Sequence, residues 1–225
     1  MRKAFQIGGL VAGAVLVVFG IVAIVMGVNG RSTVGSELKQ QQIVGSSDFA
    51  PAAYTSVVVK SGVKNLVIPS CDIAGVAVTN GTTARCFAEY VQDDALMATH
   101  GYFFSQMGIY TAKAGTPKGQ LLVGGGTDNA KYAQLDPKTK QPVQNGARNI
   151  WVTETALTTA LNTSYMASRL ALFGIVVGVA LLLSGFGFAI LAIGGALREP
   201  EKALDVVVDK GTPKAAGSAT PVPTP

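Results

Sequence analysis

Histidine is almost absent from this chain, and its scarcity excludes several kinds of catalytic site. His100 is the single histidine in 225 residues. Zinc sites built on two or three histidines, and the iron site of two histidines and one carboxylate, are therefore excluded. A Ser-His-Asp arrangement would have to use His100, and no serine lies in a G-x-S-x-G element. We expect His100 to be a surface or capping residue at the end of a helix, where a cation is favourable.

Charged residues are also scarce, at 14% of the chain against 48% hydrophobic residues. This is not the balance of a soluble protein. Residues 4–30 and 170–197 are two uncharged, mostly apolar runs, each long enough to cross a ~30 Å hydrocarbon core as a helix. A cleaved signal peptide is the alternative for the first run, but its apolar part is typically ~7–15 residues long. Because ionisable residues are missing from both runs, a transporter or pump is not expected.

The charges that flank these runs predict the topology. Arg2 precedes the first run and Arg198 follows the second, which favours cytoplasmic termini and a central part outside the plasma membrane. Arg31 and Arg169, at the other two ends, argue the opposite way. The predicted segments are a cytoplasmic N-terminus (1–3), a first transmembrane helix (4–29), an extracytoplasmic domain (30–169), a second transmembrane helix (170–197) and a disordered cytoplasmic tail (198–225).

Cysteine is limited to Cys71 and Cys86, which both lie between the apolar runs. An even pair in an oxidising compartment predicts a disulfide. A redox or metal pair is the competing interpretation, but the spacing is not C-x-x-C and there is no second pair. The sequence thus predicts a structural Cys71–Cys86 bridge and no metal or other cofactor.

Glycine pairs occur four residues apart in both runs, at Gly9 and Gly13 and at Gly174 and Gly178. This spacing lets helix backbones approach closely in lipid. The pairs predict helix packing, either between two copies of the chain or between the two helices of one chain. Glycine is also simply common in membrane helices.

The central part is expected to be mostly helical. Residues 145–198 read as one helix whose outer portion has a single apolar side, and Pro51 favours a helix to about Lys60 with Gly62 after its end. A further helix is predicted from about Ala84 to Gly101. Ser32 or Thr33 could cap a separate helix, or the first membrane helix could continue through them.

Two short strands, at residues 63–68 and 75–79, are predicted with a turn at Asn80-Gly81. Residues 112–145 read as an extended loop. The expected fold class is a mainly α membrane protein, with two transmembrane helices flanking a mostly helical extracytoplasmic α+β domain.

Two further features have structural interpretations. Asp93 and Asp94, with Glu89 one turn earlier, are expected on a solvated helix face, because adjacent helical residues point in different directions. Trp151 lies too far from the apolar run for a headgroup belt, so it is expected in the core of the central domain.

Several stretches together carry a resemblance. They are GVNGRSTVGSELKQQQIVG after the first run, TARCFAEY around Cys86, and ARNIWVTETALTTALNTSYM before the second run. The chain resembles a family of two-span membrane proteins of actinobacteria that has no assigned activity. The resemblance implies a bacterial cell envelope and leaves the activity open. Similar chains sometimes carry a label as aromatic ring-opening dioxygenases, which a single histidine contradicts.

The leading functional hypothesis is a non-enzymatic envelope protein, accessory or scaffold, that binds a partner protein or another copy of itself. The alternative is an extracytoplasmic sensor or ligand-binding module, with a pocket lined by the aromatic residues 102–104 and Tyr110. An enzyme would require Asp93, Asp94 or Glu89 to converge with His100. The two apolar runs make the lipid bilayer an expected partner. Basic residues are scattered without interleaved aromatics, so nucleic acid is not expected as a partner.

Overall fold

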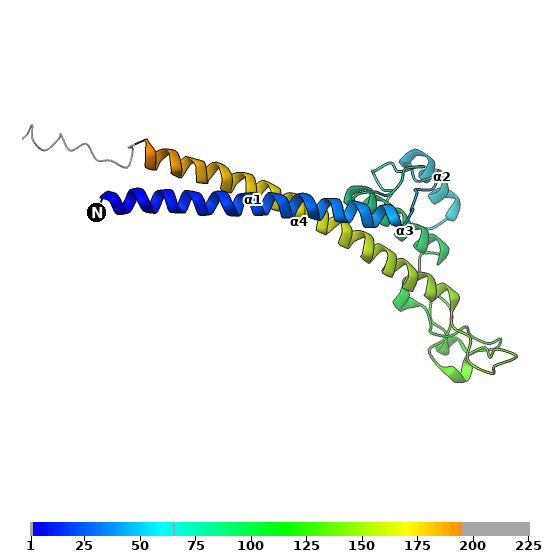
Figure 1. Ribbon diagram of the computed structural model, residues 1–225. Coiled ribbons are helices and arrows are strands. Elements are labelled where there is room, and N and C mark those ends of the chain that lie inside the picture. Colours follow the sequence, from blue (N-terminus) through cyan, green and yellow to red (C-terminus); the bar gives the residue numbers. More distant parts are fainter. Residues whose placement is uncertain (1, 65, 195–225) are drawn as a thin grey trace, which may run out of the picture. The chain divides into compact units, whose positions relative to one another are not determined.

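The computed structural model describes residues 2–64 and 66–194. Within them the chain is mainly helical, with the elements in the order α1, α2, α3, η1, η2, η3, α4 (Figure 1). The helices are α1 (Arg2–Gln40), α2 (Pro51–Ser61), α3 (Gly81–Ala98) and α4 (Gly146–Ile193), and the short 3-10 turns are η1 (Phe104–Gln106), η2 (Lys118–Gln120) and η3 (Ala130–Tyr132). The predicted tail and Arg198 lie outside the described residues.

α1 and α4 are each long and apolar enough to cross a membrane. In the most apolar window of each, only 17% of the residues are buried. A core helix of a soluble protein would be mostly buried, so their exposed apolar surface fits lipid better than water. α1 continues unbroken to Gln40, which settles whether the first helix stops near Gly30 and shows that Ser32 and Thr33 are interior positions.

The chain divides into two compact units. Of the described residues, one unit comprises 2–20 and 180–194, and the other comprises 21–64 and 66–179. In the first unit, α1 and α4 approach at Gly13, where an added Cβ would lie 2.8 Å from the Gly185 carbonyl oxygen. In the second, a Cβ at Gly27 would lie 2.6 Å from the Ala171 carbonyl oxygen. Glycine is required at both positions because the backbones leave no room for a side chain.

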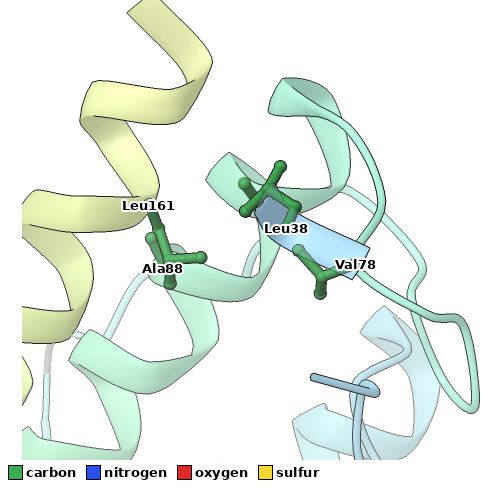
Figure 2. Packing of buried hydrophobic residues seen from close by; sticks show 5 residues of the cluster. Leu38, Val78, Ala88 and Leu161 are labelled. Atoms are coloured by element: carbon green, nitrogen blue, oxygen red, sulfur yellow. The ribbon is translucent and has the colours of Figure 1, made fainter. Parts of the chain in front are cut away.

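The first of two cores in the second unit lies where three helices meet. Leu38 of α1, Ala88 of α3 and Leu161 of α4 are all buried, together with Val78 from the α2–α3 connection (Figure 2). Their burial explains why α1 and α4 extend beyond their uncharged runs, because each extension contributes an apolar residue to this core.

A second core lies between α2 and α3. The Phe49 ring stacks on Tyr90 at 4.6 Å between centroids, and Tyr54 meets Tyr90 edge-on at 4.7 Å. α2 begins at Pro51 and ends before Gly62, whose φ of 69° forms a left-handed cap. These ends are the predicted ones, and they follow from proline at the first turn and glycine after the last.

The two predicted strands are wrong. The described residues contain only isolated β-bridges, such as Val44 with Ala77, and no sheet. Val67 is 81% exposed while Ile68 packs on the second core, and no described residue of the 63–68 segment takes part in a bridge. Asn80-Gly81 is not a hairpin turn either: the Asn80 side chain accepts hydrogen bonds from the Thr82 and Thr83 amides and caps α3.

Candidate functional site

A groove of about 600 Å³ runs between α3 and α4. Both helices contribute long polar side chains to its walls. Its lining comprises Arg85, Ala88, Glu89, Gln92, Trp151, Glu154, Thr155, Thr158, Asn162, Tyr165 and Met166. The groove lies entirely within the second compact unit, and small Ala88 lies on its α3 wall between the longer side chains of Arg85 and Gln92.

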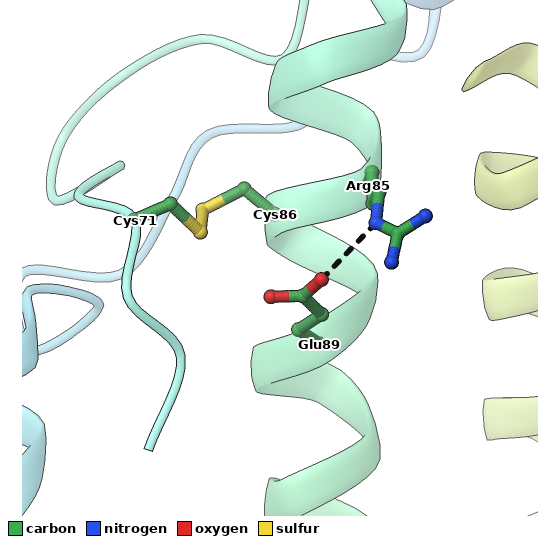
Figure 3. Close-up of polar contacts among 4 residues, drawn as sticks. All are labelled: Cys71, Arg85, Cys86 and Glu89. Carbon is green, nitrogen blue, oxygen red and sulfur yellow. Dashed lines mark hydrogen bonds and ion pairs between the residues drawn. A yellow bond between two sulfur atoms is a disulfide. The ribbon is translucent and has the colours of Figure 1, made fainter. Parts of the chain in front are cut away.

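One wall of the groove carries an ion pair. Arg85 Nε donates to Glu89 Oε1 at 3.2 Å, one helical turn along α3 (Figure 3). The Arg85 guanidinium also lies 5.0 Å from the centre of the Tyr165 ring of α4. The pair is exposed, so it contributes little to stability and presents both signs of charge to whatever enters the groove.

Trp151 and Glu154 are the two buried residues of α4 that line the groove. The Trp151 indole N–H donates to the Tyr102 carbonyl oxygen at 2.9 Å, and its ring packs on Phe103 at 5.4 Å. Trp151 is buried, as predicted for a core residue of the central domain. Glu154 is only 7% exposed, and its Oε2 accepts from the Thr155 hydroxyl at 3.1 Å.

Beside the groove, α4 exposes a face without charges. Every residue on it is threonine, alanine, asparagine, valine or methionine. The exposed positions are Val152, Thr153, Thr155, Ala156, Thr159, Ala160, Asn162, Thr163, Met166 and Ala167. A solvated surface typically carries about a quarter to a third charged residues, so this composition is unusual for a helix face in water. Thr155, Asn162 and Met166 also line the groove, which joins the two into one surface.

The carboxylates of α3 do not form the predicted solvated face. Asp93 is 8% exposed and its Oδ2 has no hydrogen-bond partner among the described residues. Burial raises the Asp93 pKa to about 6, helped by the charges of Asp94 and Glu89. Asp94 accepts a hydrogen bond from the Tyr54 hydroxyl at 2.8 Å. The prediction failed because α2 covers this side of α3, a contact that spans 40 residues of sequence.

Burial also dominates the ionisation of the neighbouring groups. It raises the pKa of the Asp94 carboxyl, while the Tyr54 hydrogen bond acts in the opposite direction. It raises the pKa of the Tyr54 and Tyr90 hydroxyls, each of which lies near carboxylates. Both hydroxyls therefore stay protonated and act as donors, Tyr90 to the Cys71 carbonyl oxygen at 2.7 Å.

The residues that an enzyme would need are engaged separately. Glu89 pairs with Arg85, Asp94 accepts from Tyr54, and His100 is exposed just after α3 with a φ of 54°. His100 thus lies at the helix end, where the sequence places it. The described residues contain no group of three or more histidine, cysteine or carboxylate side chains that could hold a metal ion.

The aromatic residues proposed for a ligand pocket pack in other ways. Phe103 contacts Trp151, and the Phe104 ring lies 4.0 Å from the Arg148 guanidinium. Tyr110 forms isolated bridges with Thr127 and Gln144 in the long loop. The groove between α3 and α4, which sequence reasoning missed, is the better candidate. No local pattern indicates it, because its two walls are about 60 to 80 residues apart in sequence.

Cys71 and Cys86 form the predicted disulfide, with their Cα atoms 6.1 Å apart (Figure 3). The bridge fastens the segment before the 75–79 stretch to α3. Both cysteines pack on the second core, beside Tyr90. The bridge therefore stabilises the packing of this core between α2 and α3.

Gly13, one of the four predicted packing glycines, lies close against the other helix, where an added Cβ would meet the Gly185 carbonyl oxygen at 2.8 Å. An added Cβ at Gly174 would lie 3.7 Å from the Ala23 carbonyl oxygen, an ordinary contact distance. Gly178 is buried and Gly9 is half-buried. Gly27 and Gly185, which the four-residue spacing does not select, make contacts as close as that of Gly13.

These glycines follow a seven-residue spacing, which could have been read from the sequence. Gly13, Gly20 and Gly27 recur on α1, and Gly178 and Gly185 on α4. All five are buried. A seven-residue repeat keeps one seam of a helix facing its neighbour.

The resemblance to the actinobacterial two-span family stays a prediction. No protein-family model, no curated protein and no solved structure matches this chain.

Proposed function

We propose that this protein is a non-enzymatic accessory protein, anchored in the plasma membrane by α1 and α4, that binds a partner membrane protein through the outer part of α4. The observation that carries the proposal is the uncharged exposed face between Val152 and Ala167. Small side chains such as Ala156, Ala160 and Thr163 allow another helix to approach closely. A helix partner from the same membrane would run alongside α4, because α4 continues directly into its uncharged segment.

Three features support the membrane placement. α1 and α4 have the length and composition of membrane spans, and their apolar side chains are largely exposed. The Cys71–Cys86 disulfide fits an oxidising compartment for the part between them. We infer that both termini are cytoplasmic and that the central part is extracellular.

Photo-cross-linking in native membranes tests the partner proposal. A photoreactive amino acid replaces Thr159, on the uncharged face, and in a matched control it replaces Lys138, on the exposed loop. We expect a cross-linked product of defined mass, containing another membrane protein, from Thr159 and not from Lys138. Products that contain only this chain would replace the accessory role with self-association, and equal products from both positions would refute the surface.

Orientation is tested separately. A cysteine introduced at Lys138 should react with a membrane-impermeant maleimide in intact cells, because this exposed loop position is extracellular in the proposed orientation. The two native cysteines do not react, because they are joined to each other. Labelling that requires permeabilised cells would show the opposite topology.

Ligand binding is a second candidate function, and the groove favours it. Its volume of about 600 Å³ lies in the range of small-molecule sites, and Arg85 and Glu89 offer both signs of charge. A ligand should raise the thermal unfolding temperature of the full chain, and the rise should disappear in Arg85→Gln. A ligand-induced rise that Arg85→Gln retains would place the binding elsewhere.

A further inference from the structure

A smaller cavity of about 150 Å³ lies where α1, α3 and α4 meet. Arginines from two different helices line it. Its lining comprises Arg31, Asn80, Gly81, Thr82, Tyr165, Ser168, Arg169 and Leu172. All of these belong to the second compact unit. The lining has two formal positive charges and no carboxylate, so the chemistry of the cavity suits an anion.

Close helix contacts form this cavity. Gly81, the first residue of α3, lies against α4: an added Cβ would meet Ser168 Oγ at 2.6 Å and Tyr165 Cα at 2.9 Å. On the other side, a Cβ at Gly30 would lie 3.5 Å from the Ala171 side chain. Gly81 thus allows α3 to lie close against α4, and α1 meets α4 at an ordinary contact distance. The exposed side chains of Arg31 and Arg169 line the space that remains.

Neither arginine forms an ion pair with a carboxylate of the described residues. Among the side chains that the structure describes, Arg85–Glu89 is the one ion pair. Arg169 instead lies 4.9 Å from the centre of the Tyr165 ring, which orients its guanidinium without cancelling its charge. Guanidinium groups bind phosphate with two parallel hydrogen bonds. The hydroxyls of Thr82 and Ser168 add further possible donors.

The cavity also lies at the level where phospholipid headgroups are expected. Arg31 directly follows the uncharged run of α1, and Arg169 directly precedes that of α4. Leu172 brings an apolar side chain to the cavity. Leu170 and Phe173, next to it on α4, are 71% and 64% exposed and would face acyl chains. A phosphate with attached hydrocarbon fits this sequence of polar and apolar groups better than a free ion does.

We propose that this cavity binds the phosphate of an anionic phospholipid headgroup between Arg31 and Arg169. Anionic lipids are favoured over zwitterionic ones because the lining has no carboxylate to pair with a headgroup amine. The inference rests on the proposed membrane crossing by α1 and α4, and it is independent of the proposed partner.

Native mass spectrometry of the full chain in detergent tests this site. The chain is titrated with phosphatidylglycerol or with phosphatidylcholine of the same acyl chains, and inorganic phosphate is added as a competitor. We expect phosphatidylglycerol to bind about tenfold more tightly, and the Arg31→Gln/Arg169→Gln double variant to lose that preference. The matched control, Lys118→Gln/Lys138→Gln, removes the same charge from exposed loop positions and should keep it.

A second variant keeps the test informative if the double variant does not fold. Arg169→Lys retains the charge but cannot make the two parallel hydrogen bonds, so its preference for phosphatidylglycerol should fall by at least about threefold. Equal binding of both lipids to the wild-type chain, or an equal loss in the lysine control, would overturn the site. Displacement of lipid by micromolar inorganic phosphate would overturn the headgroup assignment. Release of the chain from membranes by alkaline carbonate would show, separately, that the membrane crossing itself is wrong.

Discussion

Replacing Asp93 by asparagine should stabilise the fold at neutral pH and remove a specific pH dependence. The Asp93 side chain is 8% exposed, and its Oδ2 lacks a hydrogen-bond partner within the described part of the chain. Burial first, and then the charges of Asp94 and Glu89, raise its pKa from 3.8 to about 6. An ionised carboxylate is therefore held in a place that disfavours its charge.

The sign and size of the effect follow from this shift. Because the pKa is higher in the folded state, the folded chain binds more protons than the unfolded chain between about pH 4 and 6, and the free energy of unfolding falls as pH rises through that window. A shift of about two units corresponds to about 3 kcal/mol. An asparagine side chain at this position would be neutral throughout. The Asp93→Asn variant should thus be up to about 3 kcal/mol more stable than wild type above pH 7, and within about 1 kcal/mol of it below pH 4.

Urea unfolding of the full chain in detergent, followed by Trp151 fluorescence from about pH 4 to 8, measures this difference. Trp151 reports on the part of α4 that packs outside the apolar run. Asp72→Asn is the matched control, because Asp72 is exposed and accepts a hydrogen bond from the Ala74 amide, which asparagine can also accept. If Asp93→Asn and wild type lose stability in parallel between pH 4 and 6, the buried-carboxylate reasoning is refuted.

Three other substitutions have expected outcomes. Replacing Cys71 and Cys86 by serine should lower the free energy of unfolding by about 3 kcal/mol, the loop-entropy value for a separation of 15 residues; alkylation of these thiols in unreduced native protein would contradict the bridge. Gly13→Leu should cost about 1–3 kcal/mol of thermal stability in detergent by overpacking, whereas Gly8→Leu, whose Cβ meets nothing within 4 Å, should have little effect; equal losses would argue against the helix contact. Trp151→Phe should cost about 1 kcal/mol, measured by circular dichroism, because it removes one of the two hydrogen bonds that the Tyr102 carbonyl oxygen accepts, the other coming from the Thr99 hydroxyl; an unchanged midpoint would show that the hydrogen bond contributes nothing.

The helices could be predicted because their signals are local. Pro51 and Gly62 mark the ends of α2 within a residue or two, and an uncharged run preceded by regularly spaced apolar residues marks α4. The disulfide was also predictable, because two cysteines allow only one pairing. The helix ends can be predicted from neighbouring residues, and the disulfide can be predicted because no other cysteine pairing exists. A single sequence contains the information for both.

The features that failed depend on contacts between distant segments. A run such as 63–68 has the β-branched residues of a strand, but a strand also needs a paired neighbour, and none is formed here by the described residues. Asp94 looks solvated until Tyr54, 40 residues earlier, donates a hydrogen bond to it. Asn80 could have been assigned correctly, since Thr83 three residues later completes a capping box that closely resembles the serine and glutamate form.

The glycine spacing bears on where a partner could bind. Gly13 lies against Gly185 in one compact unit and Gly27 lies against Ala171 in the other, so these positions of α1 are already occupied by α4 of the same chain. A second copy could not use Gly13 for close helix packing without displacing α4. The uncharged face of α4 beyond the apolar run has no such occupant among the described residues, and its small residues offer the same kind of close approach. A partner is therefore expected there, outside the hydrocarbon core, and the Thr159 cross-link is the experiment that addresses it most directly.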